Sequence, residues 1–270
     1  MIQAVSLLLF IWGLLPSCVA QEHRPQVFFR GHLLADAYMD SPSGQLHYQA
    51  IGDPALPALV LIHGSPGDAT AWEKLLENSV LLDHFFVLLI DRPPYGETTL
   101  AGGSLSDQSA QLADFMDKHC RPCGLVGHSY GGALALQMGV DYPKQVQVIL
   151  SIAGTIAAPY QKARWYNYIA KYSPLRWVLP KDFKASNQEM WSLHNDLRAL
   201  EQQLKTMTAP VYLYQGGKDI LVKPQSAAYV DALLPNSKKI YRPDKNHFVI
   251  WTDIPDLNTL FMALKEEVNW

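Results

Sequence analysis

The sequence predicts an α/β fold in which helices flank a mostly parallel β-sheet, with a small helical insertion. Continuous apolar runs recur along the chain, as expected for strands that are buried on both faces of a parallel sheet. Segments of helical character separate these runs, and such alternation is typical of helices packed on both faces of one sheet. The alternation stops between residues 154 and 209 and then resumes. The apolar runs lie at residues 58–62, 85–90, 125–126 and 146–152.

Before the insertion, turn residues and apolar spacing define the elements. Two short strands flank the turn Ser-Pro-Ser-Gly at residues 41–44, where serine, proline and glycine favour a chain reversal. The apolar positions of residues 106–119 have helical spacing, and Ser106 is expected to be the N-cap. The predicted elements are strands at 37–39, 46–50, 58–62 and 85–90, helices at 71–76 and 106–119, the strand and helix around 125–138, and a strand at 146–152.

The segment from about residue 154 to 209 is expected to form a helical cap. It is rich in tyrosine and tryptophan, and prolines divide it. Its aromatic residues either form the apolar wall of a pocket or pack against one another, and the sequence favours neither. After it, strands are predicted at 211–214 and 239–241, followed by a closing helix at 256–268.

The first twenty residues predict export. Residues 4–16 form an apolar run that is too short to span a bilayer comfortably but long enough for the core of a signal peptide. Small residues follow, so we expect cleavage after Ala20 and a mature domain of residues 21–270 that is periplasmic or secreted. In a second interpretation Leu15-Pro16-Ser17-Cys18 acts as a lipobox, and a lipid on Cys18 anchors the protein to a membrane. A third interpretation keeps the apolar segment uncleaved.

Bulk composition indicates one globular domain; the small-molecule substrate that we expect follows from the sequence motifs and not from composition. The chain has 270 residues, of which 49% are hydrophobic and 17% charged, enough to bury one large core. The net charge is −3 and basic residues are scattered. We therefore expect no nucleic-acid partner, because such a partner requires a clustered basic surface.

Cys120 and Cys123 form a C-R-P-C pair between a predicted helix and the next strand. In an oxidising compartment the pair can close a small disulfide loop. Zinc binding would need two further ligands at suitable spacing, and none is obvious. We favour a structural disulfide over free thiols, and both over redox chemistry, because a redox pair is expected at the N-terminus of a helix.

Residues 127–131 read Gly-His-Ser-Tyr-Gly, the pattern G-x-S-x-G. Because this pentapeptide joins an apolar strand to a helix, it predicts a sharp turn that raises the Ser129 hydroxyl above the sheet. A serine hydroxyl is a weak nucleophile unless a base accepts its proton and a third group orients that base. Ser129 is therefore the candidate nucleophile.

Two later residues supply the candidate base and its orienting partner. Asp219 and His247 each follow a predicted strand, so the carboxyl ends of strands bring both near Ser129. Their order along the chain, Ser-Asp-His, is the order expected for a nucleophile on such a turn. Asp219 has an alternative role as a turn former. Asp91 and Asp244 are less suited to orient His247 because of their positions, and His128 is expected to be a packing residue.

The candidate oxyanion hole uses two backbone N–H groups. One belongs to Tyr130, directly after the nucleophile, and the other to Ser65 in the loop His-Gly-Ser-Pro-Gly at residues 63–67. Pro66 has no N–H to offer. The alternative for this loop is a plain turn between strand and helix.

Together these motifs resemble the α/β-hydrolase family from about residue 36 to the C-terminus. The matching segments are HGSPG at 63–67, DRPPYG at 91–96, GHSYGG at 127–132, GKD at 217–219 and NHF at 246–248. The resemblance implies a triad of Ser129, Asp219 and His247, a helical cap over the sheet, and neither a metal nor an organic cofactor. It points to a serine hydrolase that cleaves an ester-like bond through an acyl-enzyme.

Two other functions remain open. The HGSPG loop looks like the HGGPG loop of proline iminopeptidases, which would make the protein an aminopeptidase or amidase. Those enzymes hold the substrate amine with acidic cap residues. The second alternative is a catalytically inactive binding protein on the same fold. Epoxide hydrolases and haloalkane dehalogenases use an aspartate nucleophile, so Ser129 argues against both. The acidic residues of the cap are Asp182, Glu189, Asp196 and Glu201.

Overall fold

A computed structural model describes residues 26–120, 122–268 and 270. In this part of the chain, nine strands form one sheet in the order β1-β2-β3-β5-β4-β6-β7-β8-β9. The predicted signal peptide and Cys18 lie outside the described residues. The strands are β1 (Val27–Phe29), β2 (His32–Ser41), β3 (Gly44–Ile51), β4 (Ala58–Ile62), β5 (Phe86–Ile90), β6 (Cys123–His128), β7 (Val146–Ile152), β8 (Val211–Gly216) and β9 (Ser237–Arg242).

The sheet is parallel from β5 to β9 and antiparallel at its β1 end. Strands β1, β2, β3 and β5 pair antiparallel in succession, and every later pairing is parallel. The central strands are the apolar runs that the sequence identifies, and helices follow them. The predicted fold class is therefore confirmed.

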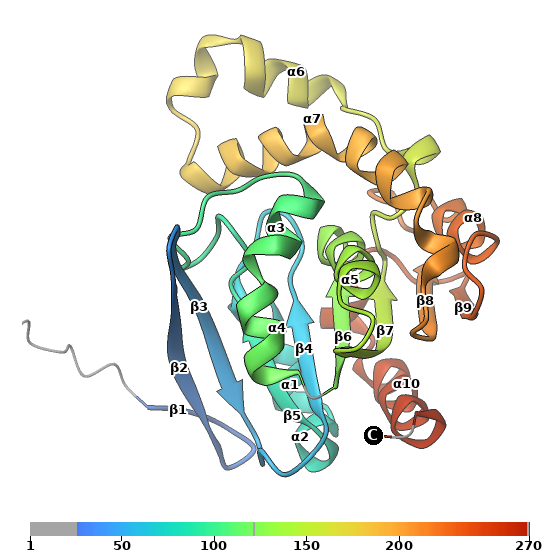
Figure 1. Cartoon of the computed structure of the whole chain (residues 1–270). Helices are drawn as coiled ribbons and strands as arrows, with labels where there is room; N and C mark the ends of the chain where they lie inside the picture. Colours follow the sequence, from blue (N-terminus) through green and yellow to red (C-terminus); the bar gives the residue numbers. More distant parts are fainter. Residues whose placement is uncertain (1–25, 121, 269) are drawn as a thin grey trace, which may run out of the picture.

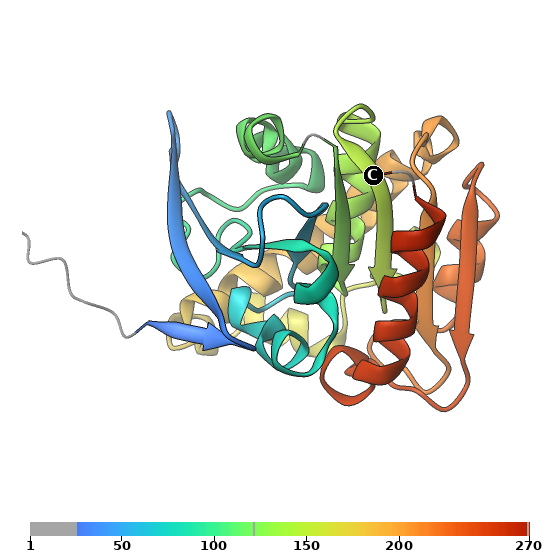
Figure 2. The same cartoon turned by 90° about the horizontal axis from the view of Figure 1, so that it is seen from below.

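Helices cover both faces of the sheet. Figure 2 shows α3, α4 and α5 on one side and α1, α2 and α10 on the other. The α-helices are α1 (Glu73–Asn78), α2 (Leu81–His84), α3 (Leu105–Gln111), α4 (Ala113–His119), α5 (Tyr130–Asp141), α6 (Trp165–Tyr172), α7 (Lys181–Glu201), α8 (Gln225–Asp231), α9 (Val249–Thr252) and α10 (Ile254–Glu267). Short 3₁₀ helices are η1 (Ala69–Trp72), η2 (Ala158–Tyr160), η3 (Pro174–Trp177) and η4 (Leu204–Thr206).

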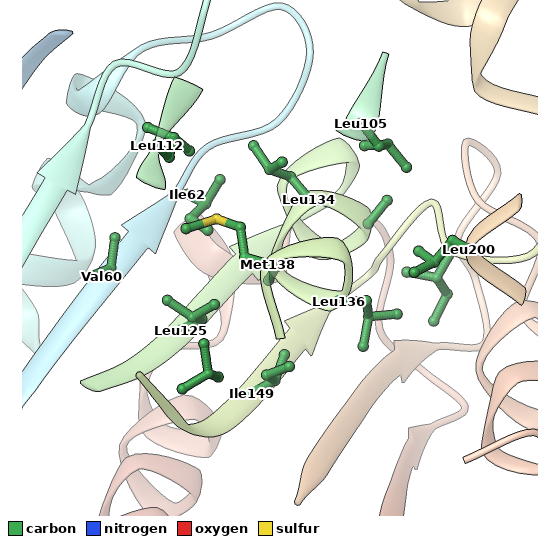
Figure 3. Packing of buried hydrophobic residues seen from close by; sticks show 14 of the residues in the cluster. Val60, Ile62, Leu105, Leu112, Leu125, Leu134, Leu136, Met138, Ile149 and Leu200 are labelled. Carbon is green, nitrogen blue, oxygen red and sulfur yellow. The ribbon is translucent and has the colours of Figure 1, made fainter. Parts of the chain in front are cut away.

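Strand β4 shows how the sheet divides the core. Its Val60 and Ile62 are buried in the cluster that includes the residues of α5, whereas the intervening Leu59 and Leu61 are buried in the cluster on the opposite face. Successive strand residues point to opposite faces, so a strand that is covered on both sides must be apolar throughout. Figure 3 shows the first face, where β4 and β6 lie against Met138 and its neighbours on α5.

The helix predicted at 106–119 differs from the structure at its start and at its middle. Ser104, not Ser106, is the N-cap. Its hydroxyl accepts a hydrogen bond from the backbone N–H of Asp107 at 3.1 Å, and the Asp107 carboxylate accepts one from the backbone N–H of Ser104 at 3.0 Å. This reciprocal capping box places Ser106 inside the first turn. The segment then divides at Leu112 into α3 and α4.

The segment between β7 and β8 forms α6 and α7 with short 3₁₀ turns. Figure 1 shows the two helices lying across one end of the sheet, with α6 outermost. They cover the edge where the parallel strands end, which is where loops gather functional groups in such folds. Within the described residues, none of the helices has the length and hydropathy needed to span a bilayer.

Cys120 and Cys123 are joined by a disulfide between the end of α4 and the start of β6. Both residues are buried. We expect reduction to lower the free energy of unfolding by about 2 kcal/mol, because a short cross-linked loop restricts the unfolded chain only modestly. The measurement is urea unfolding with and without a phosphine reductant.

The matched control is the Cys120→Ala/Cys123→Ala variant, whose unfolding curve should not respond to the reductant. Equal stability of the oxidised and reduced wild-type protein would contradict a stabilising role for the bond.

Candidate active site

Ser129 lies at the sharp turn between β6 and α5. Its backbone has φ 54° and ψ −119°, a left-handed conformation that is costly for any residue other than glycine. Small neighbours make the turn feasible. A Cβ on Gly127 would lie 2.2 Å from the Gly131 carbonyl oxygen, and one on Gly131 would lie 2.1 Å from that of Ile62. The strained turn that the pentapeptide predicts is present.

Asp219 and His247 meet at this end of the sheet. Asp219 follows β8, and His247 lies in the loop between β9 and α9. The Nδ1 of His247 lies 2.8 Å from Oδ2 of Asp219, and both side chains are buried. The tautomer that donates its Nδ1 proton to this carboxylate has its lone pair on Nε2. His247 and Ser129 line the same two cavities.

The Asp219 carboxylate also organises its own turn. Its Oδ1 accepts hydrogen bonds from the backbone N–H groups of Leu221 at 2.9 Å and Val222 at 2.8 Å. Gln215 donates to Oδ2 at 3.2 Å. The turn-forming role and the orienting position are thus combined in one residue. Fixed donors on both oxygens hold the carboxylate in place for His247.

His128 positions the loop of His247. Its Nε2 lies 3.0 Å from the backbone carbonyl oxygen of His247, and the centroids of the two imidazole rings are 4.9 Å apart. Burial, together with the neighbouring His247, lowers the pKa of His128 to about 3. The ring is therefore neutral at physiological pH and donates its Nε2 proton to that carbonyl. His128 is a packing and anchoring residue, as its place in the sequence indicates.

The two candidate oxyanion donors flank Ser129. Tyr130 is the first residue of α5, so its N–H has no partner inside the helix and lies at the positive end of the helix dipole. Ser65 lies in the loop after β4. This loop packs directly against the nucleophile, because a Cβ on Gly64 would lie 3.1 Å from Cβ of Ser129. The sequence-predicted residues Ser65, Tyr130, Ser129 and His247 all line one cavity.

Two cavities meet at Ser129. One, of about 320 Å³, lies under α6 and α7, and the other, of about 400 Å³, extends along residues 64–71 toward α9. They share Ser65, Pro66, Ser129, Leu221 and His247. A substrate that spans both would place its scissile bond beside Ser129 and its two halves in separate arms.

Sequence reasoning missed a buried ion pair between the sheet and the cap. Arg92 follows β5 and Glu189 belongs to α7; both side chains are buried and their charged groups are hydrogen-bonded to each other. The Arg92 guanidinium also donates to the carbonyl oxygens of His63 and Gly64 at 3.1 and 3.0 Å. It lies 4.2 Å from the centroid of the Tyr130 ring, in a cation–π contact.

Glu189 also holds the loop of Ser65. Its Oε2 accepts hydrogen bonds from the Ser65 hydroxyl at 2.6 Å and the Tyr95 hydroxyl at 2.8 Å. Gln108 donates to Oε1 at 3.3 Å. The carboxylate is thus surrounded by donors from the protein, and none of its capacity faces a substrate amine. From the sequence, Arg92 is only a basic residue that follows a strand. Nothing local indicates its partner, because Glu189 lies 97 residues later.

Asp91 pairs with His47 and not with His247. Its carboxylate bonds Nδ1 of His47 at 2.7 Å and accepts hydrogen bonds from the backbone N–H groups of Ala69 and Glu97 at 2.7 and 2.9 Å. Burial alone would lower the pKa of His47, but the hydrogen bond and charge of Asp91 raise it. The pair fixes the loop after β5, next to Arg92.

We expect Glu189→Gln to lower the free energy of unfolding by about 3–5 kcal/mol, because Arg92 keeps its charge in a buried site without a counter-ion. Chemical denaturation measures the effect. The control is Asp182→Asn in the exposed first turn of α7, which should cost no more than about 1 kcal/mol. Equal losses in the two variants would contradict this role for the ion pair.

Comparisons with known proteins agree with this architecture. A model of the alpha/beta hydrolase family matches residues 59–256. The chain is 37% identical over 98 residues to the dihydrolipoyllysine-residue acetyltransferase component of the acetoin cleaving system of Cupriavidus necator, covering 35% of this chain and 25% of that longer protein. It is 26% identical over 254 residues to the sn-1-specific diacylglycerol lipase of Mus musculus, covering 78% of this chain and 83% of the relative.

Solved structures show the same fold. The crystal structure of a membrane phospholipase A, described as a bacterial virulence factor, superposes with a TM-score of 0.69 at 19% identity and covers 87% of this chain and 86% of that one. The family model spans most of the chain, including the strands that carry Ser129 and Asp219 and the loop of His247. The protein belongs to the α/β hydrolase family.

Proposed function

We propose that the protein is a serine hydrolase that cleaves an ester-like bond of a small or medium, partly apolar substrate through an acyl-enzyme. The observation that carries the proposal is the strained turn at Ser129, which lines the same cavities as His247 while Asp219 holds the Nδ1 side of that imidazole. This is the arrangement that activates a serine hydroxyl.

The reaction follows from these positions. The Ser129 Oγ attacks the substrate carbonyl carbon as Nε2 of His247 accepts the hydroxyl proton. The N–H groups of Tyr130 and Ser65 stabilise the oxyanion. His247 then donates the proton to the leaving alcohol, and the acyl group remains on Ser129. Water attacks this ester, gives its proton to His247, and the carboxylic acid leaves as the Ser129 hydroxyl is restored.

The cavity under the cap supports a partly apolar substrate. Leu179, Phe183 and Met190 contribute apolar surface, while Asn167 and Asn187 contribute amide groups. Its volume of about 320 Å³ lies at the lower end of the range for small-molecule sites. The mouse relative is named as a lipase, an enzyme class that cleaves esters, which agrees with this choice.

The aminopeptidase alternative loses its main support. It needs a cap carboxylate to hold a substrate amine, but Glu189 is taken by Arg92, Ser65 and Tyr95. Glu201 accepts a hydrogen bond from the backbone N–H of Ala158 at 2.9 Å. None of the described residues that line the cavity under the cap is Asp or Glu. An inactive binding protein is also less favoured, because all three triad positions are occupied.

We expect Ser129→Ala to lower kcat by at least about 10⁴-fold, because no other group supplies the nucleophile. Labelling by a fluorophosphonate probe should disappear with it. Ser186→Ala is the matched control, since Ser186 lines the same cavity and its hydroxyl lies 2.9 Å from that of Ser65. Labelling should persist in this variant. A wild-type protein that the probe does not label would overturn the mechanism.

The bond type is tested with paired substrates. We expect p-nitrophenyl esters of short acids to have a much higher kcat/KM than aminoacyl p-nitroanilides, because no cap carboxylate is available for the amine. The Ser129→Ala variant sets the background for both assays. Predominant turnover of the anilides would replace the esterase proposal with the aminopeptidase alternative.

A further inference from the structure

Helix α6 of the cap has two different faces. Tyr166, Asn167 and Ala170 line the cavity beside Ser129. The opposite face carries an apolar stripe at the helical spacing i, i+3, i+4 and i+7, and its side chains are between 42% and 73% exposed. The stripe consists of Trp165, Tyr168, Ile169 and Tyr172. Large apolar side chains exposed side by side in this way are typical of an interaction surface.

The exposed apolar surface continues beyond α6. Trp177 and Val178 follow the helix and are 72% and 76% exposed. Ile220 is 81% exposed, and its carbonyl oxygen accepts a hydrogen bond from Nη2 of Arg164 at 3.0 Å, just before α6 begins. We call the stripe on α6 together with Trp177 and Val178 the cap surface. Figure 1 shows α6 at the outermost end of the molecule, with α7 between it and the sheet.

The sequence around the cap surface is basic. Between residues 160 and 188 the sequence has six basic residues and one acidic residue, Asp182, although the whole chain has a net charge of −3. The Lys171 ammonium lies 4.1 Å from the centroid of the Trp191 ring, which keeps this charge beside the aromatic stripe. The basic residues are Lys162, Arg164, Lys171, Arg176, Lys181 and Lys184. Lys162 and Arg164 line the cavity beside Ser129, whereas Lys171, Lys181 and Lys184 are exposed on the outside of the cap.

The residue types of the cap surface favour a lipid bilayer over a second copy of this chain as its partner. Tryptophan and tyrosine prefer the region of lipid headgroups, where the ring is apolar and its polar atom stays hydrated. Lysines flanking such a helix are attracted to anionic lipids. A symmetric contact between two copies would instead oppose two basic surfaces, because such an interface uses the same patch on both subunits.

We propose that the cap surface docks on a phospholipid bilayer that carries anionic headgroups. Helix α6 lies in the plane of the interface with Trp165, Ile169 and Tyr172 among the acyl boundary groups. Its inner face stays the wall of the cavity beside Ser129. Docking brings that cavity to the place where partly apolar molecules concentrate. The surface itself does not depend on the proposed hydrolysis, since it needs no triad residue.

The primary test is hydrogen–deuterium exchange on the full-length chain, with vesicles of phosphatidylcholine alone or with added phosphatidylglycerol. We expect slower exchange in residues 165–178 on the anionic vesicles and a smaller effect on the neutral ones. The readout is local, so binding through another segment does not imitate it. Unchanged exchange in residues 165–178 would overturn the proposal.

Variants test the two components separately by vesicle flotation. Trp165→Ser/Ile169→Ser should weaken binding at least about tenfold by removing inserted side chains. Lys181→Gln/Lys184→Gln should weaken binding to anionic vesicles roughly fivefold for each lysine, and added salt should have a similar effect. The matched control is Val27→Ser/Phe28→Ser, which removes exposed apolar residues of β1 at a distance from the cap. Equal binding by all three variants would contradict the proposal.

Two further measurements separate the possible outcomes. Protection of residues 165–178 that grows with protein concentration in the absence of vesicles would assign the cap surface to self-association instead. Trp165→Ser/Ile169→Ser should hydrolyse a soluble short-chain ester like the wild type, since neither residue lines a cavity of the site. Intact hydrolysis without vesicle binding overturns only the docking, and vesicle binding by a protein without hydrolysis overturns only the proposed function.

Discussion

The ion pair between Arg92 and Glu189 joins the cap to the loops that flank Ser129. Arg92 belongs to the loop after a central strand, and Glu189 to the long helix of the cap. The carboxylate also holds the Ser65 hydroxyl, and the guanidinium lies over the ring of Tyr130. The cap, the sheet and both candidate oxyanion donors therefore meet in one buried network. The position of α7 and the geometry around Ser129 are not independent.

A buried pair of charges is favourable only when its remaining hydrogen-bonding groups are satisfied. Here carbonyl oxygens of His63 and Gly64 accept from the guanidinium, and hydroxyl groups donate to the carboxylate. His63 also contacts Arg92: its Nε2 accepts a hydrogen bond from the backbone N–H of Arg92. Burial next to the Arg92 charge lowers the pKa of His63 to about 3, so the ring is neutral. The directional bonds favour the orientation of the cap in which these donors and acceptors are satisfied, in addition to the apolar packing of α7.

The strands are predictable from the sequence because they have local signals, and the same signals indicate that Ser129, Asp219 and His247 meet at one end of the sheet. Apolar runs identify the central buried strands, and Ser129, Asp219 and His247 each lie in the segment that follows a strand. The partner of Arg92 has no such signal, since Glu189 lies in a helix whose placement depends on the whole cap. The aromatic residues of the cap show the same limit. Sequence alone offers a pocket wall or mutual packing, and the structure contains both. Tyr166 lines the cavity, whereas Tyr168 and Tyr172 contact the ring of Trp191 on α7 and remain partly exposed to solvent.

The turn after β8 limits which substitutions can alter substrate preference without affecting His247. Leu221 lines both cavities, yet its backbone N–H is bound to the carboxylate that orients His247. A replacement that reshapes this wall by moving the main chain also tilts the imidazole. The inner residues of α6 carry no such bond to the triad. We therefore expect replacements within α6, away from Arg164 and its bond to the Leu221 carbonyl, to change substrate preference with less effect on turnover than replacements at the turn itself.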